Sequence, residues 1–203
     1  MTAKLAAALV VAVTVGWTTP SLAAGSKEAG QAKAATCSAC HGMDGTSMGP
    51  EWPNLAGQHE TYIVRQLTAF HGGQRQNPLM SPMAMILTEQ DMADLAAYFS
   101  SQPIRGGETD ASKAKLGQRV YRSGNIDAKV MACAGCHGPT GLGNAPAAYP
   151  SLQGQKAAYV ALQLRAYKAG TRTTDPNQMM RNMAAALSEE EIDAVASYVQ
   201  GLR

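Results

Sequence analysis

The sequence predicts an all-α protein made of two tandem, similar domains. The two halves of the 203-residue chain align with each other, because Cys37 corresponds to Cys133 and Pro53 corresponds to Pro150 at nearly the same offset. Self-similarity over this distance indicates a duplicated domain. In both halves apolar side chains recur at i, i+3, i+4 and i+7, which is typical of one buried helical face. No segment of useful length alternates in the way that a half-buried strand does.

Residues 1–23 have the pattern of a secretory signal peptide. Lys4 precedes an apolar stretch from Leu5 to Trp17, and Ser21-Leu22-Ala23 has the small residues of a cleavage site. The apolar stretch is shorter than the ~20 residues that span a bilayer. We therefore expect export to the periplasm, with cleavage near Ala23/Ala24.

The exported chain is expected to form a first domain at 24–102, a linker at 103–111 and a second domain at 112–203. The boundary follows a polar stretch with Gly, Ser and Pro around Ser100 to Asp110. In each domain the sequence pattern predicts three helices: one that leads to a cysteine motif, one in the middle and one at the end. Capping boxes start the two final helices at Thr88 and Ser188. Their predicted buried faces consist of Met92, Leu95, Ala96 and Phe99, and of Ile192, Val195, Ala196 and Val199.

Both domains carry a Cys-x-x-Cys-His motif, and the two motifs use all four cysteines of the chain. Two thiols at this spacing can form thioethers to the vinyl groups of haem, and the next residue offers an imidazole to the iron. The sequence therefore predicts two covalently bound haem c groups, attached through Cys37, Cys40, Cys133 and Cys136. We expect His41 and His137 to be the proximal iron ligands. A zinc site made from both cysteine pairs is the alternative, but it gives the adjoining histidines no role.

The sixth iron ligand has to come from elsewhere in each domain. Only two further histidines exist, His59 and His71, and their counterparts in the second domain are Lys156 and Lys168. Histidine therefore cannot supply the sixth ligand in both domains. We expect both residues to be partly exposed on helix surfaces.

Methionine is repeated in both domains, in a predicted loop before each final helix. Met80 corresponds to Met180, and Met83 corresponds to Met183. Met80 and Met180 lie farther from the capped helix and are favoured for that reason. Methionine also fills cores in general, so the spacing alone leaves both pairs open.

The charge distribution argues against nucleic-acid binding. The formal net charge is only +2, without the concentrated basic face that nucleic acids require. The charge is uneven, however: residues 24–106 have five basic and seven acidic side chains, whereas residues 107–203 have eleven basic and eight acidic ones. A dipolar molecule of this kind can orient itself on charged redox partners.

Over residues 24–203 the chain resembles the diheme cytochrome c4 family. The resemblance is carried by both haem motifs, the Pro-x-Leu-x-Gly-Gln segments from Pro53 and Pro150, the methionine segments and the ending at 196–203. It implies two class I cytochrome c domains related by a pseudo-twofold axis, with Met80 and Met180 as distal ligands. It also implies haem propionates close to the domain interface. Nine extra residues before Cys133, relative to the first domain, depart from the pattern.

An electron carrier is predicted rather than an enzyme, because a haem with two protein ligands has no iron position for a substrate. The expected partners are a membrane donor complex, a small copper or cytochrome carrier and a terminal oxidase, and peripheral membrane association is compatible with this role. A diheme peroxidase or a thiosulfate dehydrogenase is the alternative, and it requires one iron with a displaceable ligand.

Arg75 and Arg172, a repeated pair, are candidates to neutralise propionates, and Tyr62 and Tyr159 are interpreted as residues at the core edge.

Overall fold

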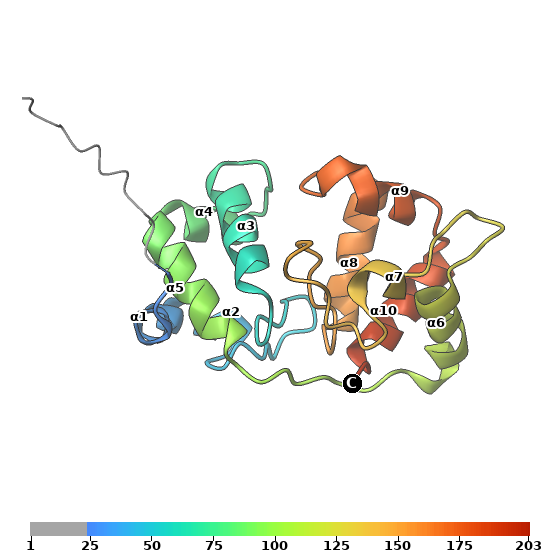
Figure 1. Ribbon diagram of the computed structural model, residues 1–203, viewed down its shortest axis with the longest axis horizontal. Coiled ribbons are helices and arrows are strands. Elements are labelled where there is room, and N and C mark those ends of the chain that lie inside the picture. Colours follow the sequence, from blue (N-terminus) through green and yellow to red (C-terminus); the bar gives the residue numbers. More distant parts are fainter. Residues whose placement is uncertain (1–23) are drawn as a thin grey trace, which may run out of the picture.

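The computed structural model describes residues 24–203, and the predicted signal peptide lies outside them. These residues form two helical domains that lie side by side and are joined by an extended segment along one edge (Figure 1). The first domain contains α1 (Lys27–Lys33), η1 (Ala34–Thr36), α2 (Ser38–His41), α3 (Glu60–His71), α4 (Met80–Met85) and α5 (Glu89–Ser100). The second contains α6 (Ala111–Ser123), α7 (Ala134–His137), α8 (Ala157–Lys168), η2 (Pro176–Gln178), α9 (Met179–Ala185) and α10 (Glu189–Gln200). The all-α prediction is confirmed, since residues 24–203 pair as strands only at two isolated bridges.

The final helices begin where the capping boxes predict. The Thr88 hydroxyl accepts a hydrogen bond from the Asp91 amide, and the Asp91 carboxylate accepts one from the Thr88 amide. Ser188 and Glu191 make the same reciprocal pair at α10. These bonds satisfy amides that the first turn leaves unpaired. The predicted apolar faces of α5 and α10 are buried, and each lies in the core of its own domain.

The segments that carry the methionines are short helices, and the prediction of a loop there was wrong. The Asn77 side chain accepts hydrogen bonds from the amides of Leu79 and Met80, which starts α4. In the second domain the Asp175 carboxylate accepts a hydrogen bond from the Arg181 amide in α9. Helices of six and seven residues are too short to show a hydrophobic period, so the sequence pattern did not reveal them.

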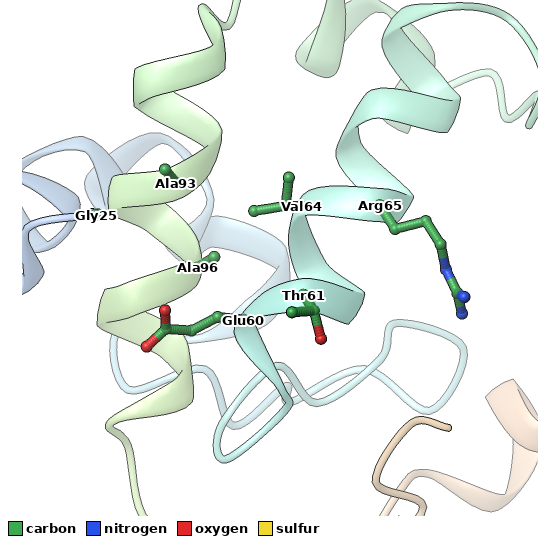
Figure 2. A pocket seen from close by; sticks show the side chains of 7 residues that line it. All are labelled: Gly25, Glu60, Thr61, Val64, Arg65, Ala93 and Ala96. Carbon is green, nitrogen blue, oxygen red and sulfur yellow. The ribbon is translucent and has the colours of Figure 1, made fainter. Parts of the chain in front are cut away.

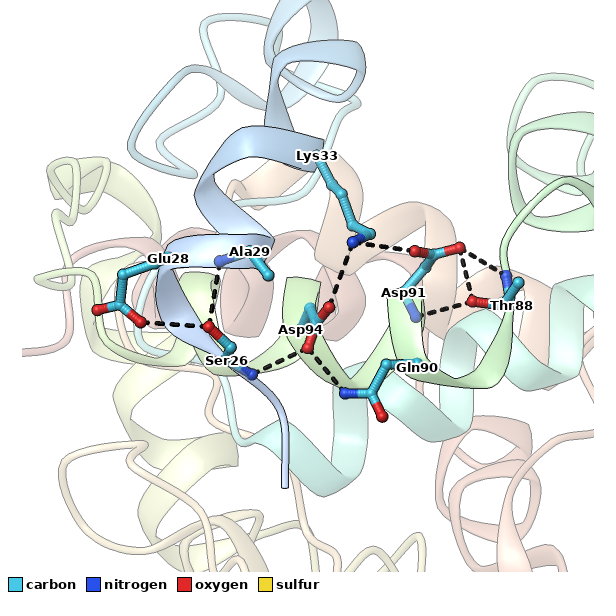
Figure 3. A network of polar contacts seen from close by, with 8 residues as sticks. All are labelled: Ser26, Glu28, Ala29, Lys33, Thr88, Gln90, Asp91 and Asp94. Atoms are coloured by element: carbon cyan, nitrogen blue, oxygen red, sulfur yellow. Dashed lines mark hydrogen bonds and ion pairs between the residues drawn. The ribbon is translucent and has the colours of Figure 1, made fainter. Parts of the chain in front are cut away.

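The first and last helices of each domain cross at a glycine. A Cβ atom at Gly30 of α1 would lie 2.0 Å from the Asp94 carbonyl oxygen of α5, and one at Gly117 of α6 would lie 2.2 Å from that of Ala194. Figure 3 shows the polar contacts that fasten α1 to α5. The Asp94 carboxylate accepts hydrogen bonds from the Ser26 amide at 2.9 Å and from the Lys33 ammonium at 3.3 Å.

The two domains meet through reciprocal contacts that follow the sequence repeat. The Gln58 side chain donates to the Ser151 carbonyl at 2.8 Å and accepts from the Ser151 amide at 2.9 Å. In the opposite direction, Gln155 donates to the Asn54 carbonyl at 2.9 Å and accepts from its amide at 2.7 Å. Because Asn54 and Ser151 occupy equivalent positions, this exchange is what a pseudo-twofold axis produces. Helices α3 and α8 face each other across the interface (Figure 1).

The nine extra residues before Cys133 form a loop between α6 and α7. Asn125 and Val130 pair through two backbone hydrogen bonds, and the Asn125 amide group donates to Glu191 of α10 at 2.7 Å. The loop is thus fastened to its own domain. It makes none of the hydrogen bonds between the domains that residues 24–203 show. Every helix in the described range is too short or too polar to span a lipid bilayer.

Candidate functional site

Each Cys-x-x-Cys-His motif is a single helical turn. Cys37 precedes α2 and His41 ends it, while Cys133 precedes α7 and His137 ends that helix. The turn places both thiols and the imidazole of a motif next to one another, and none of the four thiols forms a disulfide. This donor set fits one covalently attached haem in each domain.

A glycine ends both turns in a backbone conformation that other residues rarely adopt. Gly42 has φ +76°, and Gly138 has φ +78°. A Cβ atom at Gly42 would also lie 2.3 Å from the Thr46 carbonyl oxygen. Glycine therefore allows the chain to leave the motif directly after the histidine.

The two motif histidines are buried and held in one orientation. Each is 6% exposed. His41 Nδ1 lies 2.9 Å from the Pro53 carbonyl oxygen, and His137 Nδ1 lies 3.0 Å from that of Pro150. A carbonyl only accepts, so Nδ1 carries the proton and Nε2 keeps its lone pair for a metal. Burial lowers the pKa of both imidazoles, which favours the neutral form that ligates iron.

In each domain one tyrosine holds the chain segment that follows the motif histidine, and sequence reasoning missed both tyrosines. The Tyr98 hydroxyl of α5 donates to the Met43 carbonyl at 2.8 Å, and the Tyr121 hydroxyl of α6 donates to the Gly138 carbonyl at 2.7 Å. The two tyrosines come from different helices and are not repeat counterparts. The alignment of the halves therefore gave no signal for this shared role.

The predicted methionine ligands lie on the two short helices. Met80 is the first residue of α4 and Met180 the second residue of α9, and both are half-buried. Helix α4 packs on α3, and α9 packs on α8. Met83 and Met183 lie three positions farther on, hence on the same helix face, and Met83 is 36% exposed.

The remaining histidines lie at the two ends of α3, as expected for helix-surface residues. His59 is half-buried before the first turn, and His71 is exposed at the end of the helix. His71 Nδ1 lies 3.1 Å from the Ala84 carbonyl oxygen, which connects α3 to α4. Its counterpart Lys168 makes a similar connection by donating to the Leu187 carbonyl. Both residues thus have a structural role that a lysine and a histidine can share.

The hollow in Figure 2 lies between α3 and α5, and no residue of a haem motif lines it. Its lining is formed by Gly25, Glu60, Thr61, Val64, Arg65, Ala93 and Ala96. None of these is a predicted site residue. Within 24–203, moreover, no three His, Cys, Asp or Glu side chains lie close enough together to hold a metal ion.

Comparison with known proteins agrees with this geometry. The family model described as "Cytochrome c" matches the chain twice, over residues 27–103 and 114–203. The chain is 46% identical over 200 residues to cytochrome c4 of Stutzerimonas stutzeri, covering 94% of this chain and 95% of the relative. It is 38% identical over 170 residues to a thiosulfate dehydrogenase electron acceptor of Stutzerimonas stutzeri (strain A1501), covering 81% and 78%. The crystal structure of reduced cytochrome c4 from Pseudomonas stutzeri superposes with a TM-score of 0.86 at 45% identity, covering 89% of this chain and all of that one.

Proposed function

Because the chain belongs to the cytochrome c family, and within it to the diheme cytochromes c4, we propose that it carries electrons in the periplasm between respiratory donors and a terminal oxidase. The protein is a diheme electron carrier with two covalently bound haem c groups. The compartment, the redox partners and the iron ligands are what we propose beyond family membership. We assign His41 and Met80 to the first iron, and His137 and Met180 to the second.

The orientation of the motif histidines carries the assignment of the proximal ligands, while the choice of Met80 and Met180 rests on the likeness to the diheme cytochromes c4. With Nδ1–H donated to a proline carbonyl in both domains, only Nε2 is available to the iron. Haem supplies the one-electron couple, and methionine as the axial partner of histidine raises its potential. The chain contributes attachment, burial and ligand geometry. Two protein ligands at each iron leave no position for a substrate, which supports transfer rather than turnover.

The ligand assignment is tested by replacing each methionine. Met80→Ala and Met180→Ala are expected each to remove half of the sulfur-to-iron charge-transfer absorption of the ferric protein and to lower one reduction potential. Met83→Ala and Met183→Ala are the matched controls, because they remove the same side chain from the same face of the same short helix. Retention of the full absorption in Met80→Ala, with loss in Met83→Ala, would reverse the assignment.

The choice between a carrier and an enzyme is tested with carbon monoxide. Reduced protein with two His/Met irons is expected to bind carbon monoxide slowly and incompletely at neutral pH. Rapid stoichiometric binding to one haem would instead indicate a displaceable ligand, as a peroxidase or a thiosulfate dehydrogenase requires. The relative named as a thiosulfate dehydrogenase electron acceptor supports the carrier role and suggests a periplasmic dehydrogenase as one further class of donor.

A further inference from the structure

The segments that lead to the two methionine helices differ, although the domains otherwise repeat. Between Arg172 and Met180 the second domain has three more residues than the first domain has between Arg75 and Met80. The longer segment forms a turn of its own, η2, directly before α9. The two proposed methionine ligands are therefore reached by different backbone paths.

Two adjacent residues of the longer segment have a left-handed backbone. Asn177 has φ +53° and Gln178 has φ +58°. Residues other than glycine rarely adopt this conformation, because the Cβ atom crowds the following carbonyl oxygen. Asparagine tolerates it better than most residues do, so most of the strain lies at Gln178. Such strain persists only where the surrounding contacts hold the chain in place.

A buried ion pair spans the strained turn. The Asp175 carboxylate accepts one hydrogen bond from the Arg181 guanidinium at 2.8 Å and another from the Arg181 amide at 3.0 Å. The Asp175 side chain is only 2% exposed. Asp175 precedes the turn and Arg181 directly follows Met180, so the two bonds enclose the left-handed residues and the methionine in one closed loop. Hydrogen bonds between charged groups are stronger than neutral ones, and breaking a buried pair is costly.

A further contact links the longer segment to the proximal histidine. The Tyr149 hydroxyl donates to the Met179 sulfur at 3.9 Å. The Tyr149 ring also lies beside that of His137, with 6.4 Å between the ring centroids. The first domain has Trp52 and Leu79 at the equivalent positions. Leucine has no acceptor, so this bond can form only in the second domain.

The first domain starts its methionine helix with a neutral and exposed side chain. The Asn77 side-chain oxygen accepts from the amides of Leu79 and Met80, both at 2.9 Å. Residues 76–86 contain no charged side chain, and the counterpart of Arg181 is Ser81. Asn77 is exposed, so water competes for the bonds that it makes. They hold Met80 less firmly than the buried ion pair holds Met180.

On the premise that Met80 and Met180 ligate the irons as proposed above, we propose that Asp175 is a positioning residue for the second haem. Through Arg181 it keeps the strained turn closed and the Met180 sulfur on the iron. Met180 is therefore harder to displace by an external ligand than Met80, which no ion pair secures. The two irons thus open to small ligands with different ease, although their ligand types are the same.

The test is a titration of the ferric holoprotein with imidazole, which replaces methionine at the iron. Each iron is observed by itself, because the sulfur-to-iron absorption that remains in Met80→Ala reports Met180, and that in Met180→Ala reports Met80. The measured quantity is the imidazole concentration that replaces half of the sulfur ligand. We expect it to be about tenfold higher for Met180 than for Met80, since a hydrogen bond to a charged group contributes enough to shift an equilibrium by that factor. Equal concentrations would overturn the proposed difference.

Asp175→Asn is then added to both backgrounds. It should lower the half-replacing concentration about tenfold for Met180 and leave it unchanged for Met80. Asp193→Asn is the matched control, because it removes a carboxylate that pairs with Arg165 elsewhere in the same domain, and it should change neither value. An unchanged value for Met180 in Asp175→Asn would overturn the proposal, as would an equal change at both irons.

A rescue variant separates positioning from general stability. Gln178→Gly relieves the left-handed strain and, combined with Asp175→Asn, should raise the half-replacing concentration for Met180 again. Absence of this rescue would overturn the role of the strained turn. Thermal unfolding of the same variants measures their stability. A lower Tm of Asp175→Asn together with an unchanged imidazole titration would make Asp175 a structural residue only and overturn the proposal.

Two further results keep the test decisive. Should Asp175→Asn fail to fold, Arg181→Gln replaces it, since this substitution removes the ion pair but keeps the bond from the backbone amide to Asp175. Full sulfur-to-iron absorption in both Met80→Ala and Met180→Ala, before any imidazole is added, would contradict the ligand assignment instead.

Discussion

The glycines at the helix crossings provide the sharpest test of the packing. In Gly30→Ala the new methyl group would lie 2.0 Å from the Asp94 carbonyl oxygen and 2.8 Å from the Tyr98 Cβ. In Gly117→Ala it would lie 2.2 Å from the Ala194 carbonyl oxygen and 2.7 Å from the Tyr198 Cβ. These distances are more than an ångström short of ordinary contact with the oxygen. Both obstacles are backbone atoms of a packed helix, so no side chain can rotate away.

The size of the effect follows from two opposing contributions. Overpacking of a core costs about 1–3 kcal/mol, and the upper end applies because α1 must move as a whole away from α5. Alanine gains about 1 kcal/mol over glycine in helix propensity. The net loss in the free energy of unfolding is then about 2 kcal/mol for each domain. For a domain of fewer than a hundred residues this lowers Tm by roughly 10 °C.

Thermal unfolding of the holoprotein, followed by far-ultraviolet circular dichroism, measures this loss. Gly135→Ala is the matched control, because a Cβ atom there has nothing within 4 Å and the first motif already carries Ala39 at the equivalent position. The control should leave Tm unchanged or slightly raised. If Gly30→Ala or Gly117→Ala were as stable as the wild type, the two helices would not cross as closely as described, and the packing argument would fail.

Two further predictions concern the hydrogen bonds between the domains and the polar contacts that connect α1 to α5. Gln58→Leu removes both hydrogen bonds to the buried Ser151 and leaves its amide and carbonyl unpaired; we expect domain docking to weaken by about 2–4 kcal/mol. Calorimetry should then resolve two separate transitions, and one unchanged transition would contradict the prediction. Hydrogen bonds to the Asp94 carboxylate lower its pKa; the bond from the Ser26 amide has the largest effect, and those from the Gln90 and Lys33 side chains add to it (Figure 3). Its stabilisation is therefore complete above the unfolded pKa of about 3.9 and lost as the pH falls through the lower folded value. Urea unfolding should show Asp94→Asn less stable than the wild type near neutral pH, with the difference shrinking below about pH 4, and a constant difference would refute the ionic role.

Much of the fold can be predicted from sequence patterns that involve residues only a few positions apart. A capping box such as Thr88 with Asp91 joins residues three positions apart, and the buried face of α5 repeats within two turns. Such signals depend only on helix geometry, so sequence reasoning placed the final helices correctly. The helices at Met80 and Met180 escaped it because they are only six and seven residues long, too short to show a hydrophobic period.

The predicted haem motifs are local in the same sense. Cys37 to His41 form one helical turn, so their spacing alone brings two thiols and an imidazole together. The spacing does not say which imidazole nitrogen faces the iron. That depends on the Pro53 carbonyl, which lies twelve residues away and reaches His41 Nδ1 only in the folded domain.

By itself, the sequence determined that two equivalent helical domains each carry a haem-attachment turn, because each of those features depends on residues a few positions apart. Only the tertiary structure decided how the domains share an interface. Gln58 donates a hydrogen bond to Ser151 at a separation of 93 residues, and Arg172 donates one to Gln66 at a separation of 106. Hydrogen bonds over such separations depend on how two folded surfaces meet. The repeat could pair Arg75 with Arg172 as equivalents, but the hydrogen bonds that each donates to the other domain arise only when the two domains pack together.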